Sequence, residues 1–205
     1  MRTDIHNWQP ITVSEACAIF SAVPVQWCMA GGWALDLHMG KQSRPHDDID
    51  ILIRRDEQLT AYDHLSKEWT LYKAENGKLD RWEKGEFLIT TDDIWVSKDD
   101  HSPWAYQIML ADTDHESWIY KRERSIRRDW EDVISHTQEG IPYLKPEIQL
   151  LYKGGSSAIR EKDQKDFLQL LPLLHPQSRE WLRTALKKQF PIGHLWVEQI
   201  KKMEV

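Results

Sequence analysis

Two aspartates lie two positions apart in a run that is otherwise apolar. Asp48 and Asp50 belong to the stretch Asp48-Ile-Asp-Ile-Leu-Ile53, which alternates between polar and apolar residues at its start. Alternation is typical of a strand, in which residues i and i+2 point to one face. We therefore expect both carboxylates on one face, where they repel each other. A divalent cation is the simplest remedy, because Mg²⁺ usually binds through one or two carboxylates together with substrate phosphates.

A glycine pair precedes the two aspartates. Gly31 and Gly32 follow the short apolar run Val25–Met29, and Trp33–Met39 has helical composition. Glycine has no Cβ, so the backbone can approach a ligand closely, and the first N–H groups of a helix favour an anion. The pattern predicts a strand, a Gly-Gly turn, a helix, a loop and a strand that bears two carboxylates. A triphosphate could lie with one end at the glycines and be bridged by a metal to the aspartates.

This order of features resembles the DNA polymerase beta-like nucleotidyltransferase superfamily. The fuller string GGWALDLHMGKQSRPHDDIDI is similar to the aminoglycoside 2''-adenylyltransferase family and its bacterial relatives. The stretch Ile141–Lys153, followed by Lys162-Asp163-x-x-Asp166-Phe, resembles the same family. The resemblance implies an α+β fold with a nucleotidyltransferase-type mixed sheet and flanking helices, followed by a helical C-terminal domain.

The resemblance also implies a reaction. A hydroxyl of a small, aminoglycoside-like molecule attacks the α-phosphorus of ATP and pyrophosphate leaves, with two Mg²⁺ ions stabilising the attacking and leaving oxygens. Asp48 and Asp50 are the expected metal ligands and catalytic residues. The residues expected to bind the nucleotide are Gly31, Gly32, Arg44, His46 and Lys153. The function class that follows is an antibiotic-modifying adenylyltransferase.

The superfamily usually adds a third carboxylate from a neighbouring strand. It helps to bind the metal or accepts the hydroxyl proton, a role that contributes about 10²–10⁴-fold. The best-placed strand, Trp104–Leu110, carries Gln107 where an acid is expected, and Asp92, Asp93 and Asp112 lie on no clear alternating face. Two alternatives stay open: a nucleotide-binding protein of the same fold without transfer activity, and a toxin–antitoxin type nucleotidyltransferase that modifies a protein or RNA. The long helical C-terminal half argues against the second.

The pattern along the chain predicts a catalytic domain over residues 1–139 and a helical domain over residues 140–205, with the substrate cleft between them. Turn signals fall at Asn76-Gly77 and at Gly154-Gly155-Ser156-Ser157. We expect helices within 1–24 and over 54–69, 147–153, 160–171, 177–190 and 192–203, strands over 86–90, 94–96 and 104–110, and a solvated polar region over 112–139.

Composition excludes several function classes. The net charge of −6 argues against non-specific nucleic-acid binding. Cys17 and Cys28 are expected to be reduced thiols, since no cysteine or histidine spacing fits zinc. The N-terminus has no signal core and no run reaches membrane-spanning length, so we expect a cytoplasmic protein with no membrane partner.

Acidic residues beyond the aspartate strand suggest a polycationic acceptor. If they faced the cleft, they would attract an amino-sugar through charge-assisted hydrogen bonds. These residues are Glu83, Glu86, Asp92, Asp93, Asp99 and Asp100.

Overall fold

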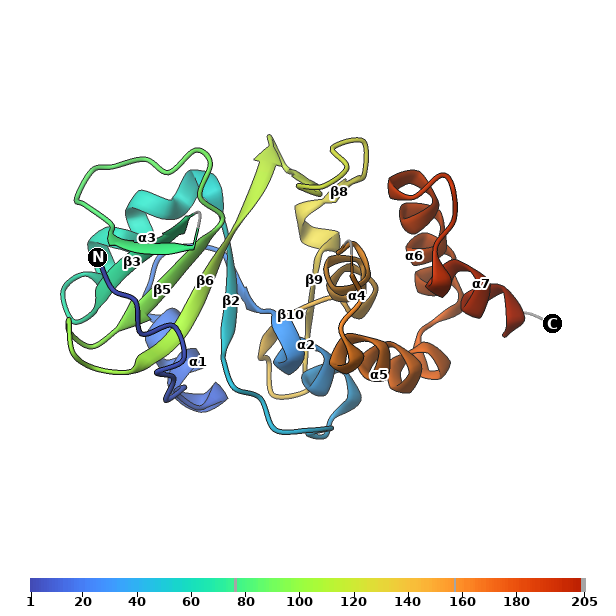
Figure 1. The fold of residues 1–205 in the computed structure, drawn as a ribbon, viewed down its shortest axis with the longest axis horizontal. Helices are drawn as coiled ribbons and strands as arrows, with labels where there is room; N and C mark the ends of the chain where they lie inside the picture. The colour runs from blue at the N-terminus through green and yellow to red at the C-terminus, as the bar shows by residue number, and fades with distance from the viewer. Residues whose placement is uncertain (76, 157, 204–205) are drawn as a thin grey trace.

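The computed structural model describes residues 1–75, 77–156 and 158–203. Its strands are β1 (Trp27–Met29), β2 (Asp50–Arg54), β3 (Thr70–Glu75), β4 (Lys78–Arg81), β5 (Asp93–Ser97), β6 (Trp104–Asp114), β7 (Ser117–Ile119), β8 (Arg127–Asp129), β9 (Ile134–His136) and β10 (Pro142–Leu144). Within the described residues they form a single mixed sheet in the spatial order β4-β3-β5-β6-β2-β1-β10-β9, and β7 and β8 continue from β6. Figure 1 shows β6 and β2 side by side at the centre of the molecule.

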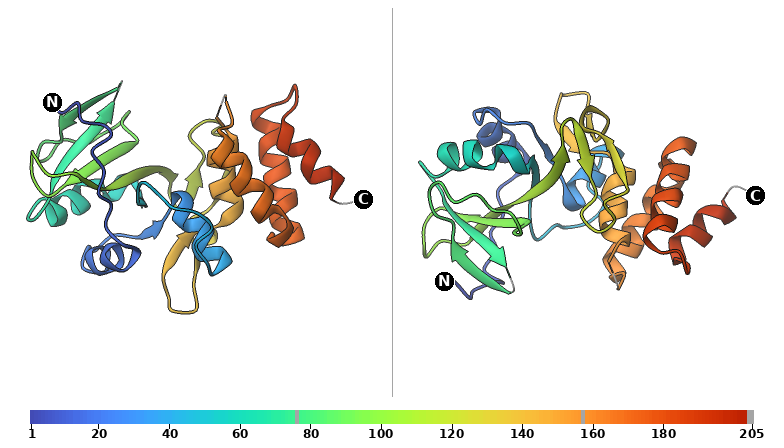
Figure 2. Two further views of the ribbon diagram at one scale, coloured as in Figure 1. Left: turned by 60° about the horizontal axis from the view of Figure 1, so that its bottom comes forward. Right: turned by 90° about the horizontal axis from the view of Figure 1, so that it is seen from above.

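The helices are α1 (Val13–Ser21), α2 (Gly31–Met39), α3 (Gln58–Leu65), α4 (Pro146–Gly154), α5 (Glu161–Leu170), α6 (Pro176–Gln189) and α7 (Leu195–Lys202). Short 3-10 turns cover Arg55–Glu57, Trp130–Asp132 and Leu171–Leu173. Helices α4 to α7 gather at the C-terminal end of the molecule, and strands β3 to β5 lie at the other end (Figures 1 and 2). The predicted mixed sheet with flanking helices, followed by packed C-terminal helices, is confirmed.

The aspartate strand runs through the core of the sheet. Ile49, Ile51 and Ile53 are fully buried, as the alternation predicted. Strand β2 runs parallel to β6 and antiparallel to β1, with Asp50 opposite Gln107. Strand β6 in turn pairs with β5 in an antiparallel arrangement. Asp50, the first residue of β2, therefore lies at the end of a central strand that is paired on both sides.

Several predicted elements differ from the observed ones. Asp48 precedes β2 rather than lying within it, because regular pairing begins at Asp50. Residues 86–90 form no strand. The Gln58 side chain instead bonds the backbone of this segment, accepting a hydrogen bond from the Leu88 amide and donating one to the Leu88 carbonyl. The region 112–139 is not wholly solvated, since it contains β7, β8 and β9. The helix expected over 54–69 is a 3-10 turn followed by the shorter α3.

The other helices lie close to their predicted positions. Helix α1 begins with a capping box, in which Thr12 and Glu15 satisfy each other's backbone amides. Pro146 occupies the first turn of α4. Asn76 and Ser157, which belong to the two predicted turn signals, lie outside the described residues. Strand β10 continues the sheet to Leu144, and the division into two domains near residue 139 stays a prediction.

Cys17 and Cys28 are both free thiols, and Cys28 is buried. Burial raises the pKa of the Cys28 thiol, so this side chain behaves as a small apolar core residue. Across the described residues, no helix combines the length and the apolar character needed to cross a membrane.

Candidate active site

Gly31 lies where the backbone turns into α2 directly beside the aspartate strand. Its φ is +65°, a left-handed value that favours glycine. A Cβ at this position would overlap the carboxylate of Asp50. The Gly31 amide donates a 2.7 Å hydrogen bond to Oε1 of Gln149 on α4. Glycine is therefore required here both by the backbone angle and by the close approach of Asp50.

The carboxyl group of Asp50 is buried near two other carboxylates, which disfavours its charged form. Burial and the charges of Asp48 and Asp93 raise its pKa to about 7, against the opposing influence of Lys153. Both Asp48 and Asp50 line the same cavity, so the predicted pairing of their carboxylates is observed. Burial first, and then the two neighbouring carboxylates, disfavour the charged form of Asp50 more than the nearby lysines favour it.

The third carboxylate of the cavity is Asp93, at the start of β5. Gln107 on the intervening strand β6 donates from Nε2 to Asp93 Oδ1 at 2.9 Å. Burial raises the pKa of Asp93, while Lys121 pulls it down. Gln107 thus occupies the position opposite Asp50 where an acid was expected, and the acid reaches the cavity from one strand further across the sheet.

These carboxylates suit a hard divalent cation. Within the described ranges, no set of three Asp, Glu, His or Cys side chains is arranged to hold a metal by itself. Mg²⁺ does not need such a set, because it commonly uses one or two carboxylates and completes its shell with water and substrate phosphates. The donor chemistry of Asp48 and Asp50, together with the raised pKa of Asp50, fits a site that Mg²⁺ enters with a nucleotide.

A buried ion network joins the helical half of the chain to the loop before Asp48. Arg44 binds Asp166 through two parallel hydrogen bonds, Nε to Oδ1 at 3.0 Å and Nη2 to Oδ2 at 3.1 Å. Lys153 Nζ lies 2.9 Å from Asp166 and 3.0 Å from Asp163. Arg160 pairs with Asp163 at 2.6 Å. These contacts orient three cations on one wall of the cavity that the carboxylates line.

Burial opposes ionisation of Asp166, yet Arg44 and Lys153 hold its pKa below the usual value. The pKa of Asp163 is lowered in the same way, by Arg160 and Lys153 against burial. Asp163 and Asp166 are therefore charged at neutral pH and anchor the cations. Lys153, which was expected to reach the triphosphate, is buried and held between these two anchors.

His46 does not line the cavity. Its Nε2 lies 2.6 Å from Oδ2 of the buried Asp36, and Ser43 donates to the other oxygen of Asp36 at 2.6 Å. The ring packs against Gly32, where a Cβ would overlap it. The glycine at position 32 is thus explained by the close approach of His46, a neighbour that the sequence pattern did not indicate.

The cavity has a volume of about 430 Å³. The structure brings together six of the seven predicted site residues in its lining: Gly31, Gly32, Arg44, Asp48, Asp50 and Lys153. It also contains Asp93, one of the acids considered for the cleft, and it adds residues that were not predicted as site residues, chiefly Gln107, Lys121, Arg122, Gln149, Arg160 and Lys162. The lining therefore contains six cationic side chains beside four carboxylates.

The expected acidic wall is absent from the lining described here. Of the six acids proposed for it, Asp93 alone lines the cavity. Three of the others form ion pairs: Glu86 with Lys73, Asp92 with Arg55 and Lys121, and Asp100 with Arg81. Asp99 accepts hydrogen bonds from backbone amides, and Glu83 lines a separate hollow beside Trp82. This expectation was wrong because chain turns and local ion pairs, rather than the cleft, account for these residues.

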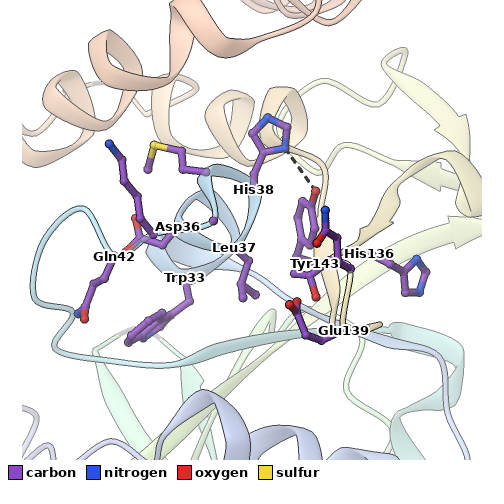
Figure 3. Close-up of a pocket in the computed structure, with 13 residues that line it drawn as sticks. Trp33, Asp36, Leu37, His38, Gln42, His136, Glu139 and Tyr143 are labelled. Carbon is purple, nitrogen blue, oxygen red and sulfur yellow. Dashed lines mark hydrogen bonds between the residues drawn. The ribbon is translucent and has the colours of Figure 1, made fainter.

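A second cavity, of about 640 Å³, lies between α2 and the β9–β10 hairpin (Figure 3). Trp33, Leu37 and Tyr143 line it, and Nδ1 of His38 lies 3.3 Å from the Tyr143 hydroxyl. It is the larger hollow, but it contains none of the three carboxylates around Asp50. The smaller cavity therefore has the chemistry of a candidate active site.

The fold and the site define a nucleotidyltransferase-type protein. The model of the aminoglycoside-2''-adenylyltransferase family matches residues 12–170, and the chain belongs to this family. A comparison with curated protein sequences gives no match.

Among solved structures, the lincosamide antibiotic adenylyltransferase LnuA with bound lincomycin is similar over 81% of this chain and 100% of that chain, with 19% identity and a TM-score of 0.55. The solution structure of the antibiotic-resistance factor ANT(2'')-Ia is similar over 88% of this chain and 93% of that chain, with 15% identity and a TM-score of 0.57. The complex of ANT(2'')-Ia with adenylyl-2''-tobramycin covers 86% and 97% of the two chains, with 12% identity and a TM-score of 0.54. At these identities the likeness establishes the shared fold.

Proposed function

We propose that this protein transfers AMP from ATP to a hydroxyl group of a small molecule. The observation that carries the proposal is the convergence of Asp48, Asp50 and Asp93 in a cavity that six cationic side chains also line. A triphosphate matches these cations, and a metal–nucleotide complex offsets the burial and the repulsion that raise the pKa of Asp50.

In this proposal different residues bind the metal and the phosphates. Asp48 and Asp50 hold Mg²⁺, which when bound supplies positive charge for the developing negative charge on the phosphate oxygens. Arg44 and Lys153, anchored by α5, bind the β- and γ-phosphates through charge-assisted hydrogen bonds. The first amides of α2 face the same phosphates, so Gln149 must release the Gly31 amide when the nucleotide binds.

Asp93 is proposed as the general base. The acceptor oxygen forms a bond to the α-phosphorus, the bond from that phosphorus to the bridging oxygen breaks, and pyrophosphate leaves. The hydroxyl proton passes to the Asp93 carboxylate, which Gln107 holds in place. Burial raises the pKa of Asp93, and this strengthens it as a base toward a hydroxyl group.

His46 is proposed to act indirectly. It fixes the loop that carries Arg44 and Asp48 through its contact with buried Asp36. It is therefore a positioning residue rather than a phosphate ligand.

The acceptor suggested by the family is an antibiotic. The solved relatives are named for lincosamide and aminoglycoside chemistry, and an aminoglycoside-like acceptor is the expectation that follows from the sequence. The alternative without transfer activity loses its main support, because it rested on the lack of an acid facing Asp50, and Asp93 provides one.

Pyrophosphate release from ATP in the presence of Mg²⁺ and a panel of hydroxyl compounds tests the proposal. We expect release that depends on both the metal and an acceptor. Tight ATP–Mg²⁺ binding without release from any acceptor would favour the nucleotide-binding alternative.

A further inference from the structure

The cations of the cavity fall into two groups that have different acidic neighbours. Arg44, Lys153 and Arg160 belong to the network around α5, and Lys153 and Lys162 are the cations that influence Asp50. Lys121 and Arg122 come from the segment after β7 and are the cations that influence Asp93. One group therefore lies beside α5 and the other beside Asp93, and we refer to these as the two ends of the cavity.

Each end serves a different reactant if the proposed function holds, on which this inference rests. In phosphoryl-type transfer the attacking and leaving oxygens are roughly in line with the phosphorus. Pyrophosphate lies at the end formed by Gly31, Arg44 and Lys153, so the attacking hydroxyl must come from the end at Asp93. The acceptor molecule consequently meets Lys121 and Arg122.

The acceptor end has a surplus of positive charge. Lys121 Nζ lies 3.1 Å from Asp92, but Asp92 is shared with Arg55 at 2.5 Å. Arg55 also binds Asp112, which in turn pairs with Arg124. This chain of contacts contains three cations beside two carboxylates, and Asp93 at the same end is a third carboxylate.

Arg122 adds a further charge at this end. Its Nη1 donates to the Tyr152 carbonyl at 2.7 Å and to the Tyr120 hydroxyl at 3.2 Å, both neutral partners. Among the described residues, no carboxylate forms an ion pair with Arg122. Its guanidinium is thus held in position by neutral groups while its remaining donors are available at the cavity.

From this arrangement we infer that the acceptor is a hydroxyl compound that carries an anionic group, a phosphate or a carboxylate, bound by Lys121 and Arg122. Guanidinium and ammonium groups bind such oxyanions through charge-assisted hydrogen bonds. A polycationic amino-sugar would meet like charges there, and like charges discriminate against the wrong ligand.

Calorimetric titration of matched ligands tests the inference. The protein is first saturated with Mg²⁺ and a non-hydrolysable ATP analogue, and then titrated with glucose, glucose 6-phosphate, gluconate or tobramycin. We expect at least one of the two anionic compounds to bind at least about tenfold more tightly than glucose, and tobramycin to bind no more tightly than glucose.

Variants test whether Lys121 and Arg122 are the residues that bind the anionic group. Arg122→Gln and Lys121→Gln should each reduce the anion preference at least about threefold while leaving the affinity for the ATP analogue unchanged. Lys165→Gln is the control, since Lys165 pairs with Glu161 on the exposed face of α5 and does not line the cavity. Thermal unfolding of each variant verifies the fold, and Lys121→Gln serves if Arg122→Gln unfolds.

The inference is overturned if neither glucose 6-phosphate nor gluconate binds more tightly than glucose. Tighter binding of tobramycin, or an anion preference that both variants retain, would overturn it as well. Failure of the proposed function is visible separately in the first titration, as a lack of binding by the ATP analogue. The sugar comparison is then made on the protein without nucleotide, where only an anion preference that Lys121→Gln and Arg122→Gln reduce supports the inference.

Discussion

Gln107 stands opposite Asp50 on the neighbouring strand and donates a 2.9 Å hydrogen bond to Asp93 on the strand beyond. The residue that replaces the expected acid therefore positions the acid that is present. A hydrogen bond to a carboxylate stabilises its charged form.

We predict that Gln107→Leu raises the pKa of Asp93 further and shifts the lower limb of the kcat–pH profile upward. Turnover on the acidic limb of the profile should fall, because less of the base is ionised there. ATP affinity, measured by calorimetry, should not change and serves as the internal control. An unshifted pH profile in the folded variant would remove Gln107 from this role.

The raised pKa of Asp50 predicts an unusual dependence of stability on pH. Its pKa is about 7 in the folded protein and 3.8 in a free chain, so between these values the folded state binds more protons than the unfolded state. The free energy of unfolding must then fall as the pH rises from about 4 to about 7, by at most about 1.4 kcal/mol per pH unit from this group.

Asp50→Asn removes this contribution. Urea unfolding of the metal-free proteins should show the variant close to wild type at pH 4.5 and more stable than wild type at pH 8. The difference between the two proteins isolates Asp50 from the other carboxylates, which titrate in both. A difference that stays constant across this range would contradict the assigned electrostatics.

Gly31→Ala tests why a glycine begins α2. The substitution forces a side chain into a left-handed backbone, which costs about 1–2 kcal/mol, and its Cβ also displaces the Asp50 carboxylate. We expect lower stability together with loss of ATP–Mg²⁺ binding.

Gly40→Ala is the matched control for this change. Gly40 has nearly the same φ, +67°, but a Cβ there would meet nothing within 4 Å. It should show the backbone strain alone and retain ATP binding. Equal nucleotide affinities in the two variants would argue that displacement of Asp50 is harmless.

Asp166→Asn tests the anchoring of the phosphate-facing cations. The substitution breaks the bidentate pair with Arg44 and the contact with buried Lys153. Loss of one partner of a buried pair typically costs about 3–5 kcal/mol, and ATP affinity should fall because both cations lose their orientation.

On the same helix, Glu161→Gln removes a partner from an exposed ion pair with Lys165. Water and salt screen exposed ion pairs, so this variant should match wild type in both stability and ATP affinity. Equal ATP affinities in Asp166→Asn and Glu161→Gln would show that the network is not needed for nucleotide binding.

The local part of the site was predictable from the sequence. Gly31, Gly32, Asp48 and Asp50 lie within twenty residues, and their spacing alone places them on a turn and at a strand. The two glycines were assigned to phosphate approach, however, while the structure also shows Asp50 and His46 packed where their Cβ atoms would lie. Such packing depends on loop geometry that spacing does not specify.

The distant part of the site depended on strand pairing. Asp93 reaches the cavity because β5 pairs with β6 in a register that puts Asp93 opposite Met109, and no local pattern determines that register. The sequence feature that could have indicated Asp93 was the pair Asp92-Asp93 immediately before the alternating run Ile94-Trp-Val96. His46 was assigned to phosphate because its partner Asp36 reads as an ordinary helix residue, although the two form a buried contact.

The central claim is that Asp93 acts as the base in transfer of AMP from ATP. The most direct measurement follows the label of α-³²P-ATP into hydroxyl acceptors in the presence of Mg²⁺, for wild type and for Asp93→Asn. We predict that wild type produces labelled acceptor and that the variant, still binding the ATP analogue normally, produces it about 10²–10⁴-fold more slowly. A variant that transfers label at the wild-type rate, or a wild-type protein that labels none of the acceptors, would contradict the account.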